Sequence, residues 1–330
     1  MVLDARDKRL LNALLDGRFH SGAALAEMLG VSRAAVWKHL QALQALGLEV
    51  AALPGRGYRL LTPVEWLSPA RITADLSGTA ADLLTGLDIH DHLDSTNSEL
   101  LRRARGDALA GLVCLAEYQS AGRGRIGRNW ISPLGTNLYL SLLWRFDDPA
   151  QVAGLSLAVG VAVMRALTVA NVPGVGLKWP NDILWGVAKL GGILLEVVGE
   201  AHGQCAVVIG LGLNRHLPGT AAATIDQPWT DLGRICDGHP PARNRLVALL
   251  LNELLPLLRD YPSHGLAPYL PEWRAGHVHA GHAASVQIGD RCFEGRILDV
   301  TDQGLLLFEE AGGDRRQFAS GDLRLRIPGR

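Results

Sequence analysis

The sequence lacks an excess of charge of either sign. Its 330 residues include 32 Lys and Arg against 33 Asp and Glu, which gives a net charge of -1. A wholly basic protein that coats nucleic acid is therefore excluded, whereas a local basic patch is not. With 48% hydrophobic residues, 38 glycines and 16 prolines, the chain also lacks the composition of a long disordered segment or a collagen-like repeat.

Cysteine is scarce and long hydrophobic runs are missing. The four cysteines lie far apart (Cys114, Cys205, Cys236 and Cys292) without a C-x-x-C pair, which argues against a zinc ribbon or a thioredoxin-like motif. We expect reduced thiols in a cytosolic protein. The start lacks a signal peptide, and the most apolar helical run, 155–170, is too short to span a bilayer and contains Arg165. We therefore expect a soluble, cytoplasmic protein with no membrane partner.

The first 62 residues have the pattern of helices followed by a hairpin. Ser21 and Ser32 are suited to cap helices over 23–29 and 33–46, and a leucine-rich helix precedes them. Two extended runs then surround a Pro-Gly-Arg-Gly turn at 54–57. Two helices joined by a short glycine-containing turn and followed by a hairpin predict a winged helix-turn-helix.

The charge of this segment agrees with DNA binding. Residues 31–60 carry a net charge of +3, from Arg33, Lys38, Arg56 and Arg59 against Glu49. Cations early on a recognition helix reach guanine edges, and a basic hairpin tip reaches phosphate or the minor groove. The candidate DNA-binding residues are Ser32, Arg33, Lys38 and Arg56. The alternative is a small helical interaction domain with a solvated charged face.

Beyond residue 68 strands and helices alternate, as the length of two or three domains allows. We expect strands at 112–117, 138–144, 194–198 and 206–213, a buried helix at 155–170, and a helix at 243–258 weakened by Pro256. The small residues at 219–224 predict a mobile loop. Five short strands after residue 283 predict a small antiparallel barrel.

The segment richest in chemistry is the arginine loop, residues 122–128, with the sequence Gly-Arg-Gly-Arg-Ile-Gly-Arg. Its glycines match G-x-G-x-x-G, but Pro133 and Gly135 prevent the helix that a dinucleotide-binding motif requires. Glycines permit tight turns, and arginines supply fixed cationic donors. The loop therefore predicts an anion site for a phosphate or acyl-phosphate. The alternative is a flexible basic surface loop.

Three further segments carry polar groups that suit either a role in ligand binding or an ordinary structural role. Lys178 and Asp182 flank a stiff Trp-Pro turn. A carboxylate beside phosphate-binding residues is suited to hold Mg²⁺; the alternative is a local salt bridge between Lys178 and Asp182. Lys189 lies beside two glycines at the start of a strand, where a ligand often approaches the backbone closely. Its ammonium group is suited to contact a reacting carboxyl or phosphate; the alternative is an ordinary lysine at a strand end. Residues 94–97 and Gln119 are suited to hold a small polar ring, or 95–97 to cap a helix.

Taken together, these motifs resemble biotin–protein ligases over nearly the whole chain. The resemblance rests on Asp-Ser-Thr-Asn at 94–97, Glu-Tyr-Gln-Ser-Ala at 117–121, the arginine loop, Lys-Trp-Pro-Asn-Asp at 178–182, Lys-Leu-Gly-Gly-Ile at 189–193 and Gly-Leu-Gly-Leu-Asn at 210–214. With the N-terminal winged helix, the chain resembles the bifunctional bacterial type, the biotin–[acetyl-CoA-carboxylase] ligase and biotin operon repressor.

The resemblance implies an enzyme that converts biotin and ATP, with Mg²⁺, to biotinyl-5′-adenylate and then acylates a lysine of the biotin carboxyl carrier protein of acetyl-CoA carboxylase. It also implies a catalytic role for Lys189, Arg123 and Arg125, and a metal-binding role for Asp182. The implied biotin-binding residues are Ser95, Thr96, Asn97, Gln119, Gly122, Arg123, Gly124, Arg125, Lys189 and Gly192. The implied ATP-binding residues are Arg125, Arg128, Trp130, Lys178, Asn181, Asn214 and Trp229.

The resemblance also implies an α+β multidomain fold. A winged helix-turn-helix domain occupies residues 1–65, a mixed α/β catalytic domain with a class II synthetase-like sheet occupies 66–280, and a small SH3-like barrel occupies 281–330. The adenylate is expected to order the arginine loop, to favour a homodimer and to promote binding to operator DNA. The alternatives are a ligase without regulatory DNA binding, a lipoate–protein ligase, and a ligand sensor that has lost catalysis.

Overall fold

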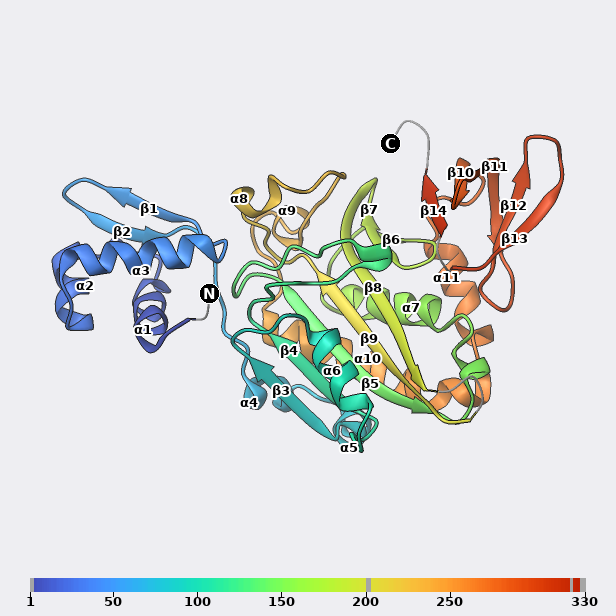
Figure 1. Ribbon diagram of the computed structural model, residues 1–330, viewed down its shortest axis with the longest axis horizontal. Coiled ribbons are helices and arrows are strands. Elements are labelled where there is room, and N and C mark those ends of the chain that lie inside the picture. Colours follow the sequence, from blue (N-terminus) through green and yellow to red (C-terminus); the bar gives the residue numbers. More distant parts are fainter. Residues whose placement is uncertain (1–2, 200–202, 321–322, 327–330) are drawn as a thin grey trace.

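The computed structural model describes residues 3–199, 203–320 and 323–326. Along its long axis lie an N-terminal helical part, a central sheet covered by helices, and a C-terminal sheet (Figure 1). Each part corresponds to one of the sequence patterns. The domain boundaries expected at residues 65 and 280 fall in the two connections, after β2 and after α11, and stay predictions.

The N-terminal part contains three helices and a two-stranded wing: α1 (Ala5–Leu14), α2 (Gly22–Leu29), α3 (Arg33–Ala45), β1 (Val50–Leu53) and β2 (Gly57–Leu60). Ser21 and Ser32 cap α2 and α3 by accepting hydrogen bonds from backbone amides three residues on. Leucines from the three helices and the wing form a separate core. The expected winged helix-turn-helix is confirmed.

The central sheet has seven strands in the order β3-β4-β5-β9-β8-β7-β6. Their bounds are β3 (Gly86–His90), β4 (Leu112–Ala116), β5 (Leu138–Phe146), β6 (Val175–Lys178), β7 (Asp182–Trp185), β8 (Ala188–Gly199) and β9 (Cys205–Leu213). β3 and β4 pair in parallel and the other pairs are antiparallel. The sheet is mixed, as expected.

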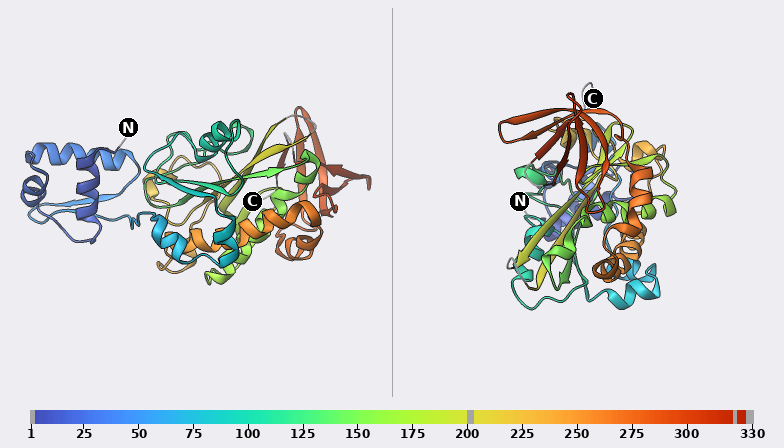
Figure 2. Two further views of the ribbon diagram at one scale, coloured as in Figure 1. Left: turned by 90° about the horizontal axis from the view of Figure 1, so that it is seen from below. Right: turned by 90° about the vertical axis from the view of Figure 1, so that its right-hand side faces the viewer.

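Helices cover both faces of this sheet (Figure 2). Their bounds are α4 (Pro69–Ala74), α5 (Gly78–Leu83), α6 (Thr96–Ala104), α7 (Leu155–Val169), α8 (Gly219–Ala222), α9 (Leu232–Ile235), α10 (Arg243–His264) and α11 (Leu270–Gly276). Alternate residues of β5 divide between two cores: Leu142 packs with α7 and α10, and Leu143 packs with α6. Within the described ranges, no helix combines the length and apolarity that crossing a membrane requires.

Two local expectations need correction. The helix expected to weaken at Pro256 continues to His264 through a second proline, because both turns pack against the core that α7 and the sheet form. The small-residue stretch expected to be a mobile loop instead forms the short helix α8 at its start, where Ala222 is buried.

The C-terminal part is a five-stranded antiparallel sheet in the order β13-β12-β11-β10-β14. Its strands are β10 (Ala283–Ile288), β11 (Arg291–Val300), β12 (Leu306–Glu310), β13 (Arg315–Phe318) and β14 (Leu323–Arg326). Among the described residues, no pairing between β13 and β14 closes this sheet, so the expected barrel is found only as an open sheet. Val286 and Phe308 join the central core, which docks the sheet on the catalytic part.

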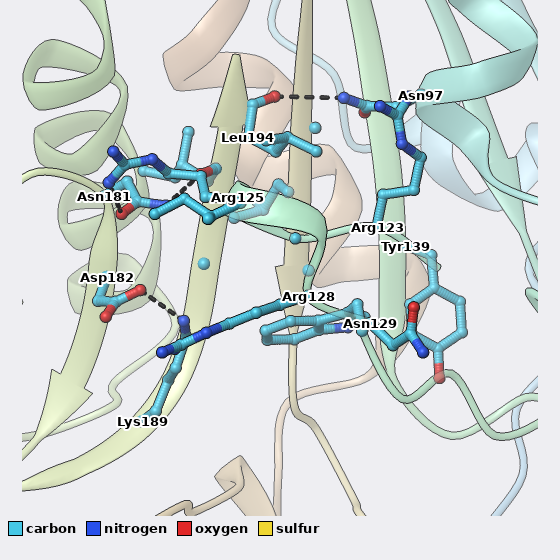
Figure 3. A pocket seen from close by; sticks show the side chains of 18 of the residues that line it. Asn97, Arg123, Arg125, Arg128, Asn129, Tyr139, Asn181, Asp182, Lys189 and Leu194 are labelled. Atoms are coloured by element: carbon cyan, nitrogen blue, oxygen red, sulfur yellow. Dashed lines mark hydrogen bonds and ion pairs between the residues drawn. The ribbon is translucent and has the colours of Figure 1, made fainter. Parts of the chain in front are cut away.

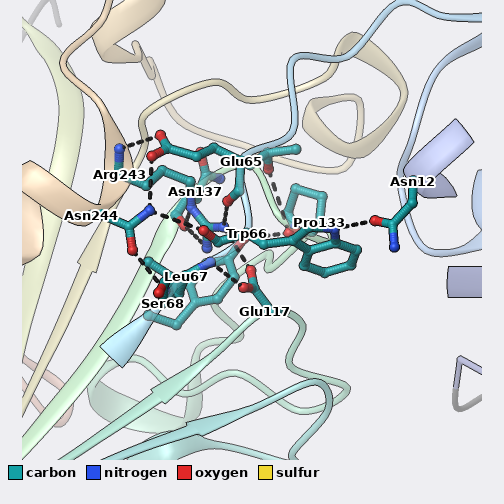
Figure 4. Close-up of polar contacts among 12 residues, drawn as sticks. Asn12, Glu65, Trp66, Leu67, Ser68, Glu117, Pro133, Asn137, Arg243 and Asn244 are labelled. Atoms are coloured by element: carbon teal, nitrogen blue, oxygen red, sulfur yellow. Dashed lines mark hydrogen bonds and ion pairs between the residues drawn. The ribbon is translucent and has the colours of Figure 1, made fainter. Parts of the chain in front are cut away.

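The connection between the winged helix and the catalytic part is held by a group of contacts that we call the linker clamp (Figure 4). Arg243, fully buried at the start of α10, forms an ion pair with Glu117 at 2.6 Å and donates to the backbone oxygens of Glu65 and Asn137. Glu117 also accepts from the backbone amide of Leu67 at 2.7 Å. The linker backbone is therefore fixed from the catalytic side.

The winged helix adds contacts of its own to this region. The indole N–H of Trp66 donates to the Asn12 side chain of α1 at 2.7 Å (Figure 4). The backbone amide of Leu134 donates to the backbone oxygen of Leu46, just after α3, at 3.0 Å. Because Leu134 lies six residues after the arginine loop and Glu117 lies two residues before Gln119, the linker clamp adjoins the cleft described next.

Candidate active site

A large cleft lies over the central sheet, between the arginine loop, the β6–β7 turn and the first residues of β8 (Figure 3). It is open to solvent at its mouth and is lined by polar, charged and apolar side chains. A concave site with a few fixed polar groups among apolar walls is the usual form of a small-molecule site.

One end of the cleft is lined by neutral polar side chains. Gln119 accepts from the backbone amide of Thr96 at 2.9 Å and donates to the Ser132 hydroxyl at 2.9 Å. The Ser141 hydroxyl lies 2.7 Å from that of Thr96 and 2.5 Å from the Asn97 side-chain oxygen. These side chains are buried. Fixed amide and hydroxyl groups of this kind orient a small polar ring.

The helix-capping alternative for residues 95–97 can now be judged. Ser95 occupies the N-cap position of α6, but its side chain makes no capping hydrogen bond. Ser95, Thr96 and Asn97 all line the cleft. The segment therefore begins a helix with its backbone, while its side chains lie at the wall of the cleft, where those of Thr96 and Asn97 are already fixed by hydrogen bonds.

Glu196 of β8 links this neutral end to the arginine loop. Its carboxylate accepts from the Asn97 amide at 2.9 Å and forms an ion pair with Arg123 at 2.7 Å. Asn97 packs against the bare Cα of Gly210 in β9, where a Cβ would lie 2.1 Å from the Asn97 side-chain oxygen. Arg123 is therefore positioned beside the polar-ring end, with its charge partly neutralised.

The arginine loop itself forms a small hairpin over the cleft. The backbone amide of Gly124 donates to the backbone oxygen of Arg128 at 2.7 Å, and the backbone amide of Trp130 donates to the backbone oxygen of Gly122 at 2.8 Å. A 3₁₀ turn, Arg125–Gly127, closes the tip, with Ile126 at φ +55°. No α-helix follows the loop before β5, so the structure excludes the dinucleotide-binding alternative.

Arg125 reaches across the cleft to two other parts of the chain. It donates to the Asn181 side chain at 3.2 Å and to the backbone oxygen of Ser320, between β13 and β14. Leu325 of β14 also lines the cleft. The C-terminal sheet therefore contributes directly to the wall around the arginine loop.

The other end of the cleft is cationic. Lys189 forms an ion pair with Asp182 at 2.5 Å, and Arg128 extends toward this pair (Figure 3). Burial lowers the pKa of Lys178, and the charges of Lys189 and Arg128 lower it further, whereas Asp182 raises it. Three cations face one carboxylate here. Such a surplus of positive charge in a partly buried site favours an anionic ligand, because phosphate would restore the balance.

An apolar surface joins the two ends. Trp130 lies against the bare Cα of Gly212, where a Cβ would approach within 2.4 Å of the indole, and Lys189 lies 5.8 Å from the Trp130 ring centroid. Leu140 and Leu211 continue the lining. An aliphatic chain between a polar ring and a carboxylate matches this order of environments.

The structure brings most of the predicted site residues together. Those lining the cleft are Ser95, Thr96, Asn97, Gln119, Arg123, Gly124, Arg125, Arg128, Trp130, Lys178, Asn181, Asp182, Lys189 and Gly192. Gly122, Asn214 and Trp229 are not among the lining residues within the described ranges. Asn214 donates to the Thr230 backbone oxygen at 3.1 Å, and Arg234 covers the Trp229 ring at 3.8 Å.

Sequence reasoning missed several polar contributors. Ser132, Ser141 and Glu196 complete the hydrogen-bond network, and Gln227 lines the cleft. Ser141 carries a usable signal, since it is the one small polar side chain within the apolar strand 138–144. Glu196 interrupts the apolar run 193–198 in the same way. Ser132 and Gln227 lie in loops without a distinguishing pattern.

The candidate DNA-binding residues lie together on the winged helix. Ser32 uses its hydroxyl to cap α3, at 3.2 Å from the Ala35 amide. Arg33 and Lys38 are exposed, and within the described ranges neither has a carboxylate partner. Arg56 lies at the wing tip, with its guanidinium 4.9 Å from the Phe19 ring centroid. Unpaired cations on a recognition helix remain available to phosphate.

Comparisons with known proteins agree with this architecture. The model of the "Biotin/lipoate A/B protein ligase family" matches residues 91–214, and that of an "HTH domain" matches residues 6–59. The Escherichia coli K12 protein named bifunctional ligase/repressor BirA is 38% identical over 319 residues, covering 96% of both chains. The Mycobacterium tuberculosis biotin–[acetyl-CoA-carboxylase] ligase is 37% identical over 248 residues, covering 72% of this chain and 88% of that protein.

A solved structure supports the fold alone. The biotin protein ligase from Aquifex aeolicus in complex with biotin and ATP matches with a TM-score of 0.62 and 24% identity, covering 74% of this chain and all of that chain. The fold is thus that of the class of protein ligases that such structures represent. From its full-length similarity, the chain belongs to the biotin–protein ligase family that carries an N-terminal helix-turn-helix domain.

Proposed function

We propose that this protein activates biotin with ATP to biotinyl-5′-adenylate and transfers the biotinyl group to a lysine of the biotin carboxyl carrier protein of acetyl-CoA carboxylase. The observation that carries this proposal is the division of one cleft into a neutral polar end, an apolar middle and a cationic end. Biotin has a ureido ring, an aliphatic chain and a carboxylate in the same order. The relatives named above supply the substrate identity.

The neutral end is assigned to the ureido ring. Ser95, Thr96, Asn97 and Gln119 offer hydroxyl and amide groups to its carbonyl and N–H groups, and Arg123 lies beside them through Glu196. Gly124 and Gly192 allow the backbone to pass close to the ligand, whereas Gly122 stays a prediction. The wall around Trp130 accommodates the aliphatic chain.

The cationic end is assigned to the reacting carboxylate and the ATP phosphates. In the first step the biotin carboxylate attacks the α-phosphorus, an O–P bond forms, and pyrophosphate leaves with the electron pair of the broken P–O bond. Lys189 stabilises the negative charge on the α-phosphoryl oxygens, with Arg125 closing over the same group. Arg128, Lys178 and Asn181 hold the departing phosphates, and Trp130 flanks the nucleotide. Asn214 and Trp229 stay predictions as nucleotide contacts.

The residues fit a magnesium ion that arrives with ATP. Magnesium is commonly held by one or two carboxylates together with substrate phosphates and water. Within the described ranges, the cleft offers the single carboxylate Asp182 at its phosphate end, since Glu196 lies at the other end. We assign Asp182 as the metal ligand. The ion would supply charge neutralisation to the phosphates, and Asp182 would meanwhile exchange its pairing with Lys189 for the ion.

In the second step the amine of the carrier lysine attacks the activated carbonyl. A C–N bond forms, the C–O bond to AMP breaks, and the attacking nitrogen loses a proton. Adenylation makes this possible at neutral pH. AMP is a far better leaving group than the oxide dianion that an amine would have to expel from a free carboxylate. The mouth of the cleft, between the arginine loop and the C-terminal sheet, is where the carrier lysine would enter.

The ligase proposal is tested by biotin-dependent exchange of labelled pyrophosphate into ATP. The unmodified protein should catalyse exchange, Lys189→Ala should reduce it by at least about a hundredfold, and Lys38→Ala, on the exposed face of α3, should leave it unchanged. Exchange with lipoate instead of biotin would support the lipoate–protein ligase alternative. No exchange with either acid would overturn the adenylation proposal.

We also propose that the protein represses biotin synthesis genes by binding operator DNA as a homodimer when the adenylate is bound. Support comes from the winged helix, its match to a helix-turn-helix model, and the exposed cations Arg33 and Lys38, which have no carboxylate partner among the described residues. The relative named ligase/repressor adds to this. The C-terminal sheet, which we expect to complete an SH3-like barrel, is assigned to the ligase function. The alternative is a ligase whose winged helix does not regulate transcription.

A further inference from the structure

The recognition helix α3 carries one large aromatic side chain that the fold does not bury. Trp37 is 45% exposed, the highest value among the large apolar side chains of α1–β2. Val36 and Leu40 of the same helix are buried in the domain core. The face of α3 that packs against the core therefore does not include Trp37. A single exposed apolar side chain is common on protein surfaces, but Trp37 lies on the same helix as the exposed cations Arg33 and Lys38, the candidate DNA contacts.

Trp37 lies in the middle of the outer stripe of α3. Ala34, Trp37 and Gln41 are spaced by three and four residues, so they share one face of the helix, and all are exposed. Arg33 and Lys38 flank this stripe, exposed and without carboxylate partners in the described part of the chain. An apolar centre bordered by cations matches base edges bordered by phosphates.

The side chain is also held in place from one side. The ring of Tyr58, in β2, lies 6.3 Å from the Trp37 ring, measured between centroids, at an interplanar angle of 36°. Tyr58 is itself fixed, because its backbone amide and carbonyl pair with those of His20 at 2.8 Å. Trp37 is therefore a positioned aromatic group rather than a freely rotating one, which suits recognition.

In the major groove the apolar feature that distinguishes bases is the 5-methyl group of thymine. We propose that Trp37 reads a thymine methyl group in each half-site of the operator and thereby determines specificity at that base pair. The inference rests on the DNA-binding part of the proposed function. Arg33 and Lys38 supply the cationic contacts, whereas Trp37 contributes discrimination and little of the charge-dependent affinity.

The test separates this inference from DNA binding itself. A duplex is first selected from a random library by the unmodified protein in the presence of biotin and MgATP. Each thymine of that duplex is then replaced by uracil, which lacks only the methyl group, and affinities are measured by fluorescence anisotropy. At one position per half-site, uracil should weaken binding by the unmodified protein about fourfold, the value of one buried methyl group.

Three variants complete the design. Trp37→Ala should bind the thymine and uracil duplexes equally, and Trp37→Phe should retain a preference for thymine. Lys38→Ala is the matched control on the same face: it should weaken both duplexes by the same factor. All three should keep biotin-dependent pyrophosphate exchange, which verifies that the protein is folded.

Several results would overturn the inference. These are indifference of the unmodified protein to uracil at every position, a selected site without thymine, or a Trp37→Ala variant that still distinguishes thymine from uracil at the same position. A library that enriches no sequence would instead overturn the DNA-binding proposal. In that case Trp37 would be assigned to a protein partner.

Discussion

Single missing Cβ atoms in β9 shape the neutral end and the apolar middle of the candidate active site. A Cβ at Gly210 would lie 2.1 Å from the Asn97 side-chain oxygen, and one at Gly212 would lie 2.4 Å from the indole of Trp130. Atoms do not approach that closely, so either substitution must displace a side chain that lines the cleft. Glycine is required here by contact, and not by backbone conformation.

The Gly212→Ala substitution should therefore impair catalysis. Trp130 has to move into the cleft, and overpacking of this kind costs about 1–3 kcal/mol, so biotin-dependent pyrophosphate exchange should fall about tenfold or more. Gly78→Ala is the control, because nothing lies within 4 Å of the new Cβ at the start of α5. Equal exchange rates for the two variants would show that Trp130 does not need its position.

A single histidine should make the protein sensitive to acid. His277 is buried against Trp273, with ring centroids 4.4 Å apart. Burial, against the opposing charge of Asp299 and with a smaller contribution from the charge of His282, lowers the pKa of His277 to about 4. Between the ordinary value of 6.5 and about 4, the unfolded chain binds a proton that the folded protein does not. Stability must therefore fall as pH falls through this window.

The full shift corresponds to about 3 kcal/mol of unfolding free energy. Urea unfolding at pH 7 and pH 4 should show that His277→Phe loses about that much less stability on acidification than the unmodified protein. His264→Phe, at an exposed position near the end of α10, is the control and should leave the pH dependence unchanged. Parallel pH profiles for all three proteins would contradict the assignment.

At the scale of elements, the linker clamp depends on a buried ion pair. Removing one partner of such a pair leaves the other charge uncompensated and costs about 3–5 kcal/mol. Glu117→Gln should therefore lower the free energy of unfolding by about 3 kcal/mol, measured by urea unfolding. Asp260→Asn removes the partner of Arg259 at the surface and should cost less than about 1 kcal/mol. Equal losses of unfolding free energy in the two variants would mean that the buried ion pair of the linker clamp stabilises the protein no more than a surface ion pair does.

The elements themselves were largely predictable from the sequence. Period-3.6 leucines and serine caps predicted α2 and α3 within a residue or two, and the apolar runs predicted β4, β5 and β9. The continuation of α10 past Leu258 to His264 was not predictable, because tertiary packing of Tyr261 outweighs the local cost of Pro262. Strand order and the open C-terminal sheet are long-range properties without a local signal.

Site residues were predictable where charge or glycine formed a motif. Lys189, Asp182 and the arginine loop stand out in the sequence and meet in the cleft. Ser132 and Glu196 act through hydrogen bonds made across the sheet, and sequence spacing does not show those. Trp229 and Asn214 lie near the cleft in sequence order but find partners elsewhere, in Arg234 and Thr230.

At the scale of the whole molecule, three parts of the chain converge on the arginine loop. Arg125 contacts the C-terminal sheet, and the segment after the loop contacts the end of α3 through Leu134 and Leu46. A ligand that changes the loop therefore acts beside the connection to the winged helix. This arrangement provides a physical route by which adenylate binding and DNA binding can influence each other.

Biotin with MgATP should raise the affinity for the selected duplex, and linkage requires that the duplex raise the affinity for the adenylate by the same factor. Couplings of this type commonly amount to about 5- to 150-fold. Anisotropy measures the first effect, and the dissociation of labelled adenylate with and without duplex gives the second. Equal duplex affinities with and without biotin would remove the regulatory switch while leaving the ligase proposal intact.

The turn at the tip of the arginine loop has a consequence for turnover. Ile126 is β-branched and lies at φ +55°, where its side chain is disfavoured by about 1–3 kcal/mol. The hairpin is thus held against this strain by its own backbone hydrogen bonds, between Gly124 and Arg128 and between Gly122 and Trp130. We therefore expect the loop to open more readily after the reaction than a loop with an unstrained glycine at its tip.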